Sequence, residues 1–441
     1  MPEQKDLYML KDHKKNRVLF TEDMKKDYTI LAPMMLPIHF AFIGNIIRQY
    51  GYNLVILETT HRGIVDEGLK HVHNDTCYPA LLVIGQLLDA LKSGAYDPNK
   101  TALMITQTGG GCRASNYIHL LRKALLKADF PQVPVISMNL KKMEQHPGFK
   151  LSWGMIIKFS YAALYADMMM CLANQCRPYE VEAGATQKVI DELVAEISPY
   201  FMDKRFRKAE ENYLKILAAF KKIQLNKTDK IKVGIVGEIY MKYAPLGNNN
   251  LEDYLLSEGA EPVLSGVLDF FLYSVNHSFV DVKLYKSGWV APVKQWITRK
   301  LFGYLEHLQN KMIDIIKADA AFHAPAPFKR LQYLVKGFIS QGVKMGEGWL
   351  LTAEMLELID SGVNNIVCTQ PFGCLPNHIV AKGMIRSIKN TYPNANIVAV
   401  DYDPGATKIN QENRIKLMLA NAVKLDKAEK EAAAKTNNNK K

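Results

Sequence analysis

Long hydrophobic runs are the first feature that the sequence lacks. No stretch of about 18 uncharged apolar residues occurs in its 441 residues, so no transmembrane helix is expected. The longest apolar stretch, which begins after Lys158, is interrupted by Asp167. The first 27 residues carry charges of both signs and lack the apolar centre of a signal peptide. We therefore expect a cytoplasmic protein with no membrane partner.

Several common catalytic and nucleotide-binding motifs are also missing. The sequence contains no P-loop, no GxGxxG, no HExxH and no Ser–His–Asp signature. Its composition is otherwise ordinary for a globular protein, with 48% apolar and 23% charged residues, which excludes wholesale disorder and collagen-like sequence. At ~150 residues per domain, the length indicates two or three domains. No catalytic residue can be assigned from these patterns.

Acidic residues are outnumbered by basic ones. There are 56 Lys and Arg against 44 Asp and Glu, which gives a formal net charge of +12, and the tail at 424–441 carries part of the excess. A basic protein can bind nucleic acid, but no basic stripe interleaved with aromatic residues supports that function. We expect a basic protein that binds no nucleic acid. Attraction to an anionic small molecule or to an acidic protein partner remains open.

Short apolar runs alternate with helical patterns along most of the chain. Runs such as LVIL and ALMI are apolar throughout, as strands covered on both faces should be. Strands separated by helices of 10–15 residues indicate βαβ units and parallel sheets. The fold class is therefore predicted to be α/β, with two Rossmann-like parallel-sheet domains that face a cleft, and additional helices. The predicted strands are 28–32, 53–58, 101–106, 133–137, 231–236, 364–368 and 396–400, and the predicted helices lie near 38–50, 78–93, 114–128, 349–361, 376–390 and 409–422.

Two regions do not follow this alternation. Residues 152–224 form a long helical region, and 265–345, rich in aromatic residues and lysine, is predicted to be mostly helical. The tail is expected to extend the last helix before it frays. The predicted organisation is an N-terminal extension at 1–27, a first α/β domain at 28–184, a helical linker at 185–230, a second α/β domain with a helical insertion at 231–423, and a flexible basic tail at 424–441.

The sequence is poor in cysteine, and its six cysteines lack the paired CxxC spacing of common structural zinc sites. Structural disulfides are rare in the cytosol, so another role is expected. Cys77 stands just before an apolar helix, and Pro79 suits the first turn of that helix. The positive end of a helix dipole favours a thiolate. Cys77 is therefore a candidate metal ligand.

Cys112 follows three consecutive glycines, in the segment between a predicted strand and the next helix. Glycines allow the backbone to approach a bulky group closely. A glycine-rich loop before a helix can instead hold a phosphate, but this one matches no nucleotide-binding pattern. The cysteine favours a metal over a nucleotide.

Cys368 and Cys374 flank a third turn between a strand and a helix, and Pro376 again follows closely after the second of them. The three turns share one predicted design: a parallel strand, a loop marked by Gly or Pro, a cysteine and a helix. Ligands of doubly wound sheets bind beyond the carboxyl ends of the strands. Two half-domains that face each other can therefore bring Cys77, Cys112 and Cys374 to one cleft.

Three converging thiolates can hold an iron–sulfur cluster, with helix N-termini compensating its negative charge. Zinc is the competing metal, and small buried cysteines with no metal are the simplest alternative. We prefer that alternative for Cys171 and Cys176, which fall within or at the end of an apolar helix. Cys368 is intermediate, since a thiol at a strand end can be a further ligand or a neighbour of one.

Two other segments give weaker signals. The segment Gly234–Tyr240, a strand followed by the polar loop Gly247–Asn250, is a candidate cleft wall. The segment Gly346–Trp349 can cap a helix or line a pocket.

The cysteine loops resemble a known family. The segments NDTCYPALLVIGQ, TQTGGGCRASNYIHLLRKAL, QPFGCLPNHIVAKGMIRSIK and DYDPGATKINQENRIKLML are similar to the 2-hydroxyacyl-CoA dehydratase superfamily. They are most similar to the C-terminal module of acyl-CoA dehydratase activase-related proteins. The similarity runs over most of residues 28–420.

The resemblance implies Rossmann-like domains around a [4Fe-4S] cluster held by three cysteines, or a larger double-cubane assembly as in related proteins. By position in the loops, Cys77, Cys112 and Cys374 match the iron ligands, and Cys368 is an additional candidate. A separate ATP-dependent activator with its own cluster would supply low-potential electrons. The family pairs two subunits, so a homo- or heterodimer is expected.

Two functions follow from this resemblance. The first is a dehydratase-like lyase, or the component of an ATP-dependent reductase, that acts on a small-molecule substrate for which an acyl-CoA is one candidate. An open iron can also act as a Lewis acid toward a substrate oxygen. The second is a non-catalytic iron–sulfur electron carrier or redox-responsive subunit.

Overall fold

The computed structural model describes residues 11–12, 17–73, 75–108, 110–139, 143–285 and 292–438. Within these residues the chain forms two compact units. Unit 1 comprises the described part of Met1–Ala166 together with Glu192–Ala209 and Tyr243–Asn249, and unit 2 comprises the rest. The segment predicted as a linker, 185–230, is divided between the two units.

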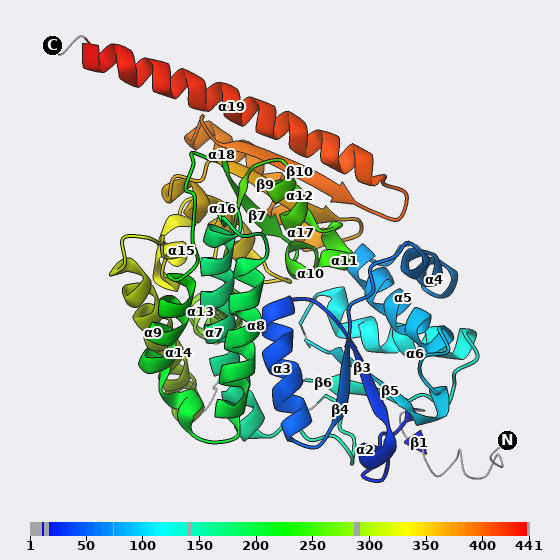
Figure 1. The fold of residues 1–441 in the computed structure, drawn as a ribbon. Coiled ribbons are helices and arrows are strands. Elements are labelled where there is room, and N and C mark those ends of the chain that lie inside the picture. The colour runs from blue at the N-terminus through cyan, green and yellow to red at the C-terminus, as the bar shows by residue number, and fades with distance from the viewer. Residues whose placement is uncertain are drawn as a thin grey trace. The chain divides into compact units, whose positions relative to one another are not determined.

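Unit 1 is built on a four-stranded parallel sheet with the strand order β4-β3-β5-β6 (Figure 1). Helices connect each strand to the next, as the sequence predicted for βαβ units. The elements of this sheet domain are β3 (Thr29–Pro33), α3 (Pro37–Gln49), β4 (Asn53–Leu57), α4 (Gly63–His71), α5 (Tyr78–Lys92), β5 (Thr101–Thr106), α6 (Tyr117–Lys127) and β6 (Val135–Met138).

Both faces of this sheet are buried, which explains why its strands are apolar throughout. Ile30 and Met104 belong to a core cluster on one face, together with Ile47 of α3. Their neighbours along the strands, Leu31 and Leu103, point to the opposite face and are also buried. Helix α5 contacts β3 and β4, and α6 contacts β5 and β6.

Unit 2 repeats this plan with a second four-stranded parallel sheet, in the order β10-β9-β7-β8. The fold is therefore α/β with two parallel-sheet domains, as predicted. Its strands are β7 (Lys232–Gly237), β8 (Glu261–Leu264), β9 (Asn365–Pro371) and β10 (Asn396–Tyr402), and its flanking helices include α16 (Trp349–Asp360) and α19 (Lys408–Asn438).

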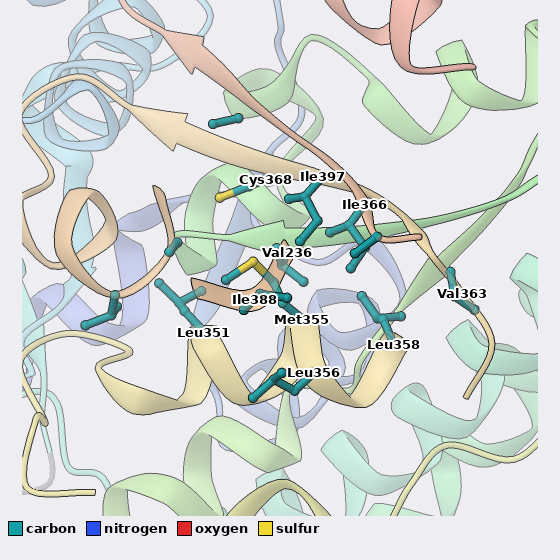
Figure 2. Packing of buried hydrophobic residues seen from close by; sticks show 14 residues of the cluster. Val236, Leu351, Met355, Leu356, Leu358, Val363, Ile366, Cys368, Ile388 and Ile397 are labelled. Carbon is teal, nitrogen blue, oxygen red and sulfur yellow. The ribbon is translucent and has the colours of Figure 1, made fainter. Parts of the chain in front are cut away.

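One face of the second sheet packs on α16. Figure 2 shows Val236, Cys368 and Ile397 of three neighbouring strands gathered with Leu351 and Met355 of that helix. All five side chains are buried. Because side chains alternate along a strand, Gln370, two positions after Cys368 within β9, lies on this same face.

The helical regions are confirmed in position. The predicted helical stretch at 265–345 contains α13 (Leu268–Tyr285), α14 (Pro292–Lys317) and α15 (Phe328–Leu334). The predicted helical region at 152–224 contains α7 (Trp153–Cys176), α8 (Ala185–Ile197) and α9 (Ala209–Phe220). Smaller helices include α10 (Ile239–Tyr243), α11 (Pro245–Asn248), α12 (Leu251–Ser257), α17 (Leu375–Val380) and α18 (Ile385–Thr391).

Helix α7 is long and apolar enough to cross a membrane by length and composition alone, yet 67% of its most apolar window is buried inside the protein. Asp167 interrupts this window. Its carboxylate oxygens accept hydrogen bonds from the backbone N–H groups of Val267 and Leu268, at 2.8 and 2.9 Å. These N–H groups stand at the start of α13 and have no partner within their own helix. The packing of α7 is that of a core helix.

The structure differs from the sequence prediction at α4, which was missed. Its two glycines lower its helix propensity, so the sequence shows little helical preference there. Close packing on α5 stabilises it instead. A side chain at Gly85 of α5 would come within 2.1 Å of the carbonyl oxygen of Ile64, so only glycine allows this approach.

Two further differences concern unit 2. Strand β8 was missed because Pro262 lies inside it, and proline is tolerated only at a sheet edge, which is where β8 lies. The predicted helix near 376–390 is broken into α17 and α18 by a turn that contains Gly383. Helix α19 continues through residue 438, into the segment assigned to the basic tail (Figure 1).

Candidate functional site

Two of the predicted thiol ligands occupy equivalent places in the two sheets. In unit 1 the second strand, β4, pairs on one side of β3, and the third strand, β5, pairs on the other side. In unit 2, β8 and β9 pair on the two sides of β7 in the same way. The strand order therefore reverses beside β3 and beside β7. Strands β5 and β9 are the strands added at these reversals. Cys112 follows β5, and Cys374 follows β9. Crevices at the carboxyl ends of such strands are the usual ligand sites of doubly wound sheets.

Cys77 is the N-cap residue of α5, with Pro79 in the first turn, as the sequence predicted. The predicted strand–loop–cysteine design is wrong for this residue, because α4 intervenes between β4 and the Cys77 turn. Helix α5 leads into β5 as α16 leads into β9 in unit 2. The equivalent N-cap position of α16 is Gly348, so the second unit carries no cysteine there.

The loops of Cys77 and Cys112 are joined by side-chain contacts. The Sγ of Cys77 lies 2.8 Å from the hydroxyl oxygen of Tyr117, the first residue of α6. The guanidinium of Arg113, next to Cys112, donates a hydrogen bond to the carbonyl oxygen of Asp75. Unit 1 thus holds two predicted ligand loops against each other. Asn74, also part of the first loop, lies outside the described residues.

The glycine-rich loop that leads to Cys112 is anchored by side-chain hydrogen bonds. Ser115 Oγ donates to the carbonyl oxygen of Gly110 at 2.8 Å, and Gln107 Nε2 donates to the carbonyl oxygen of Ser115 at 3.2 Å. A Cβ at Gly110 would meet no described atom within 4 Å, so this side of the loop is open. Gly109 lies outside the described residues. The loop therefore combines a tethered backbone with room for a ligand.

Cys374 is buried and is the N-cap residue of α17, directly after Gly373. The loop before α16 lies against this turn, because an ideal Cβ on Gly346 would stand 3.3 Å from the ring of Pro376. Within the described chain, neither Cys77, Cys112 nor Cys374 uses its thiol to cap the helix that it precedes. Their sulfurs are therefore not committed to helix capping.

Cys368 is placed differently from these three residues. It lies within β9, is 0% exposed and belongs to the apolar cluster on α16 (Figure 2). Its Sγ is 3.7 Å from Oδ1 of Asn377. Burial raises the pKa of its thiol to about 12, which disfavours the thiolate that a metal requires. The surroundings of Cys368 favour a packing role.

Cys171 and Cys176 both lie on α7. Burial raises the pKa of each thiol to about 12. The Cys171 Sγ lies 3.7 Å from the carbonyl oxygen of His323. Both placements agree with the packing role that we preferred from the sequence.

A group of carboxylates at the carboxyl end of β7 was not recognised from the sequence as a site. Glu238 directly follows β7, and Glu347 directly precedes the N-cap of α16. Oε1 of Glu347 accepts a hydrogen bond from the N–H of Ile239 at 2.9 Å, and Oε2 of Glu238 accepts one from the N–H of Met241 at 2.9 Å. The Gly-Glu pairs in both segments were the available signal, but nothing in the sequence showed that they meet.

Glycine is required next to Glu347, in the turn that precedes α16. Gly348 has φ +48°, and a Cβ there would lie 2.3 Å from the Tyr273 hydroxyl oxygen. The Tyr273 hydroxyl donates to the carbonyl oxygen of Gly346 at 3.1 Å. The segment Gly346–Trp349, predicted to cap a helix or line a pocket, therefore does cap α16 and turns Glu347 toward the end of β7.

The donor chemistry of Cys77, Cys112 and Cys374 fits an iron–sulfur cluster, since thiolate sulfur is the usual ligand of such clusters and each of the three residues is an N-cap residue. Among the residues that the structure describes, no three His, Cys, Asp or Glu side chains are gathered closely enough to hold a metal ion. Cys77 and Cys112 lie in unit 1 and Cys374 in unit 2, and the meeting of all three stays a prediction.

No protein-family model matches the chain, and no curated protein matches it.

Proposed function

We propose that the chain is an iron–sulfur protein of the 2-hydroxyacyl-CoA dehydratase type, with Cys77, Cys112 and Cys374 as the iron ligands. The observation that supports it most is the contact between Cys77 and Tyr117, which ties the first ligand loop to the helix that follows the second. Cys374 supports it by its equivalent place after β9. Cys368 is the weakest candidate because it lies in an apolar core.

A bound [4Fe-4S] cluster or double-cubane assembly would supply one-electron chemistry at low potential. The chain's own contribution is to bind the cluster through thiolates and to place helix N-termini toward its negative charge. Hydrogen bonds to the sulfurs, such as that offered by Tyr117, tune the potential. The glycine-rich loop leaves room for a bulky group beside Cys112.

The proposed activity is that of a cytoplasmic lyase or reductase component. Electrons would come from a separate ATP-dependent activator with its own cluster, because this sequence has no nucleotide-binding motif. The substrate would be a small molecule, with an acyl-CoA as one candidate, and the working form a homo- or heterodimer. Neither nucleic acid nor a membrane is part of the proposal.

Anaerobic purification of the full chain tests the metal. We expect a brown protein that absorbs near 400 nm, contains iron and acid-labile sulfide in similar amounts, and gives an EPR signal after reduction. Serine variants of Cys77, Cys112 and Cys374 should each lose most of the iron. A serine variant of Cys176 is the control, because that thiol is buried, as those of Cys77 and Cys374 are, but lies on α7.

Two results would contradict the proposal: an iron-free protein after anaerobic expression with iron and sulfide supplied, or equal iron loss in the Cys176 variant. A complete cluster that turns over no substrate with an activator and ATP would identify the electron carrier instead of the enzyme.

A further inference from the structure

The carboxylates of Glu238 and Glu347 form a second site-like feature in unit 2. Both side chains meet at the first turn of α10, where each accepts a backbone N–H. Glu347 is buried, at 7% exposure, whereas Glu238 keeps partial exposure.

The positive charge that acts on Glu347, that of Lys242, also acts on a third carboxylate. Lys242, on α10, is buried and donates to Glu354 Oε1 at 3.0 Å and to Ser265 Oγ. One lysine is therefore shared among several carboxylates. Burial, followed by repulsion from Glu347, raises the pKa of Glu238 to about 8, and burial also raises the pKa of Glu347. Two adjacent carboxylates in such surroundings cannot both be ionised at neutral pH without a large cost.

Gln370 supplies an independent observation at the same edge of the sheet. In the register of the parallel pair, Gly237, the last residue of β7, stands beside Thr369, and Gln370 is the next residue of β9. Gln370 lies two residues beyond Cys368 and thus on the α16 face. Its side chain is 1% exposed, and its Oε1 accepts no hydrogen bond from any residue that the structure describes. A buried acceptor of this kind calls for a donor, which a protonated carboxyl or a ligand can provide.

We propose that Glu238 and Glu347 hold one proton between them and form an acid–base site at the carboxyl end of β7, where they can donate that proton to an oxygen atom of a neutral small molecule. The site lies within unit 2, in the corner where the Gly346 loop packs on Pro376 beside Cys374. It does not depend on a metal, because only carboxylates and backbone groups build it.

Three other ionisable groups face the pair. Glu354 of α16 adds negative charge, Lys242 of α10 offsets it, and Tyr273 of α13 stays protonated because burial, and then the charge of Glu347, raise its pKa. The hydroxyl of Tyr273 already donates to Gly346. The proton that this site can donate is therefore held by Glu238 and Glu347.

Dicyclohexylcarbodiimide, which reacts with protonated carboxyl groups in apolar surroundings, tests the site in the full-length protein without any cluster. At pH 7 we expect one adduct, located by peptide mass spectrometry at Glu238 or Glu347, and its yield should fall as the pH passes about 8. Glu210 is the internal control, since its surface ion pair with Lys311 keeps it ionised.

The variant Glu347→Gln removes the repulsion but keeps an oxygen that can accept the Ile239 N–H. It should lower the pH of half-maximal labelling at Glu238 by about one unit or more. Glu210→Gln should leave that pH unchanged. The proposal is overturned if the folded wild-type protein, checked by circular dichroism, shows no adduct at either residue at pH 7, or if Glu347→Gln leaves the labelling profile where it was. An iron-free protein that still forms the adduct would refute the proposed cluster and support this inference.

Discussion

The thiol of Cys77 and the hydroxyl of Tyr117 lie 2.8 Å apart although 40 residues separate them in the chain. Cys77 is the N-cap residue of α5 and Tyr117 is the first residue of α6, so a single contact connects the starts of two helices. Arg113 reinforces the connection through the carbonyl oxygen of Asp75. This relationship gives the proposed cluster site its most specific structural test.

Replacing Tyr117 by Phe removes the hydroxyl but keeps the ring. If Cys77 binds iron, the iron content should stay near the wild-type value, because the ligand itself is unchanged. A hydrogen bond worth about 1 kcal/mol stabilises the more negative, reduced cluster, so its loss should lower the one-electron reduction potential by ~40 mV. A redox titration followed by EPR measures this shift. Tyr333→Phe, at an exposed position, is the control, and an identical potential in both variants would contradict the role of Tyr117.

Cys368→Ala separates a packing role from a ligand role. Because the side chain is fully buried among apolar residues, its truncation should lower the free energy of unfolding by about 1 kcal/mol and leave the iron content unchanged. Urea unfolding and iron analysis on the same preparation give both values. Cys176→Ala should behave alike, since that thiol is also fully buried. Loss of iron from the Cys368 variant alone would make Cys368 a ligand after all.

The N-terminal part of unit 1 should be sensitive to acid through His146. Its Nδ1 accepts the N–H of Phe20 at 3.0 Å, and Arg17 lies 3.3 Å from its Nε2. Burial, and then the charges of Arg17 and Arg122, lower the pKa of His146 to about 4. The unfolded chain binds this proton at about pH 6.5, so the folded protein loses stability as the pH falls from 6.5 toward 4, by at most about 3 kcal/mol.

Glu144 adds to this effect in the same direction. Although burial alone raises its pKa, hydrogen bonds and charge from Arg122, and the charge of Arg17, lower it below the ordinary value. A carboxyl group with a lowered pKa in the folded state stabilises that state at pH values above its pKa in the unfolded chain. This stabilisation is lost on acidification. Urea unfolding at several pH values measures the sum. His146→Gln should flatten the curve between pH 4 and 6.5, whereas exposed His307→Gln should not, and equal curves for both variants would refute the assignment.

The sequence by itself determined the alternation of strands and helices. Strands such as β5 and β9 are short apolar runs because both faces of a parallel sheet are covered, and that periodicity is local. The same local reading placed Cys77 and Cys374 at helix starts, since Pro79 and Pro376 mark first turns. It missed α4, whose stability comes from packing on α5 through Gly85 rather than from its own propensity.

Only the tertiary structure decided which side chains meet. The Glu347 carboxylate reaches the N–H of Ile239 across 108 residues of chain, and no local pattern encodes such a contact. The strand register likewise turned Cys368 into the core, while Cys374, six residues later, stands at a helix start. Local propensity depends on neighbours within one helical turn or strand, whereas a site depends on contacts between elements, and these form only when the sheet and its helices pack together.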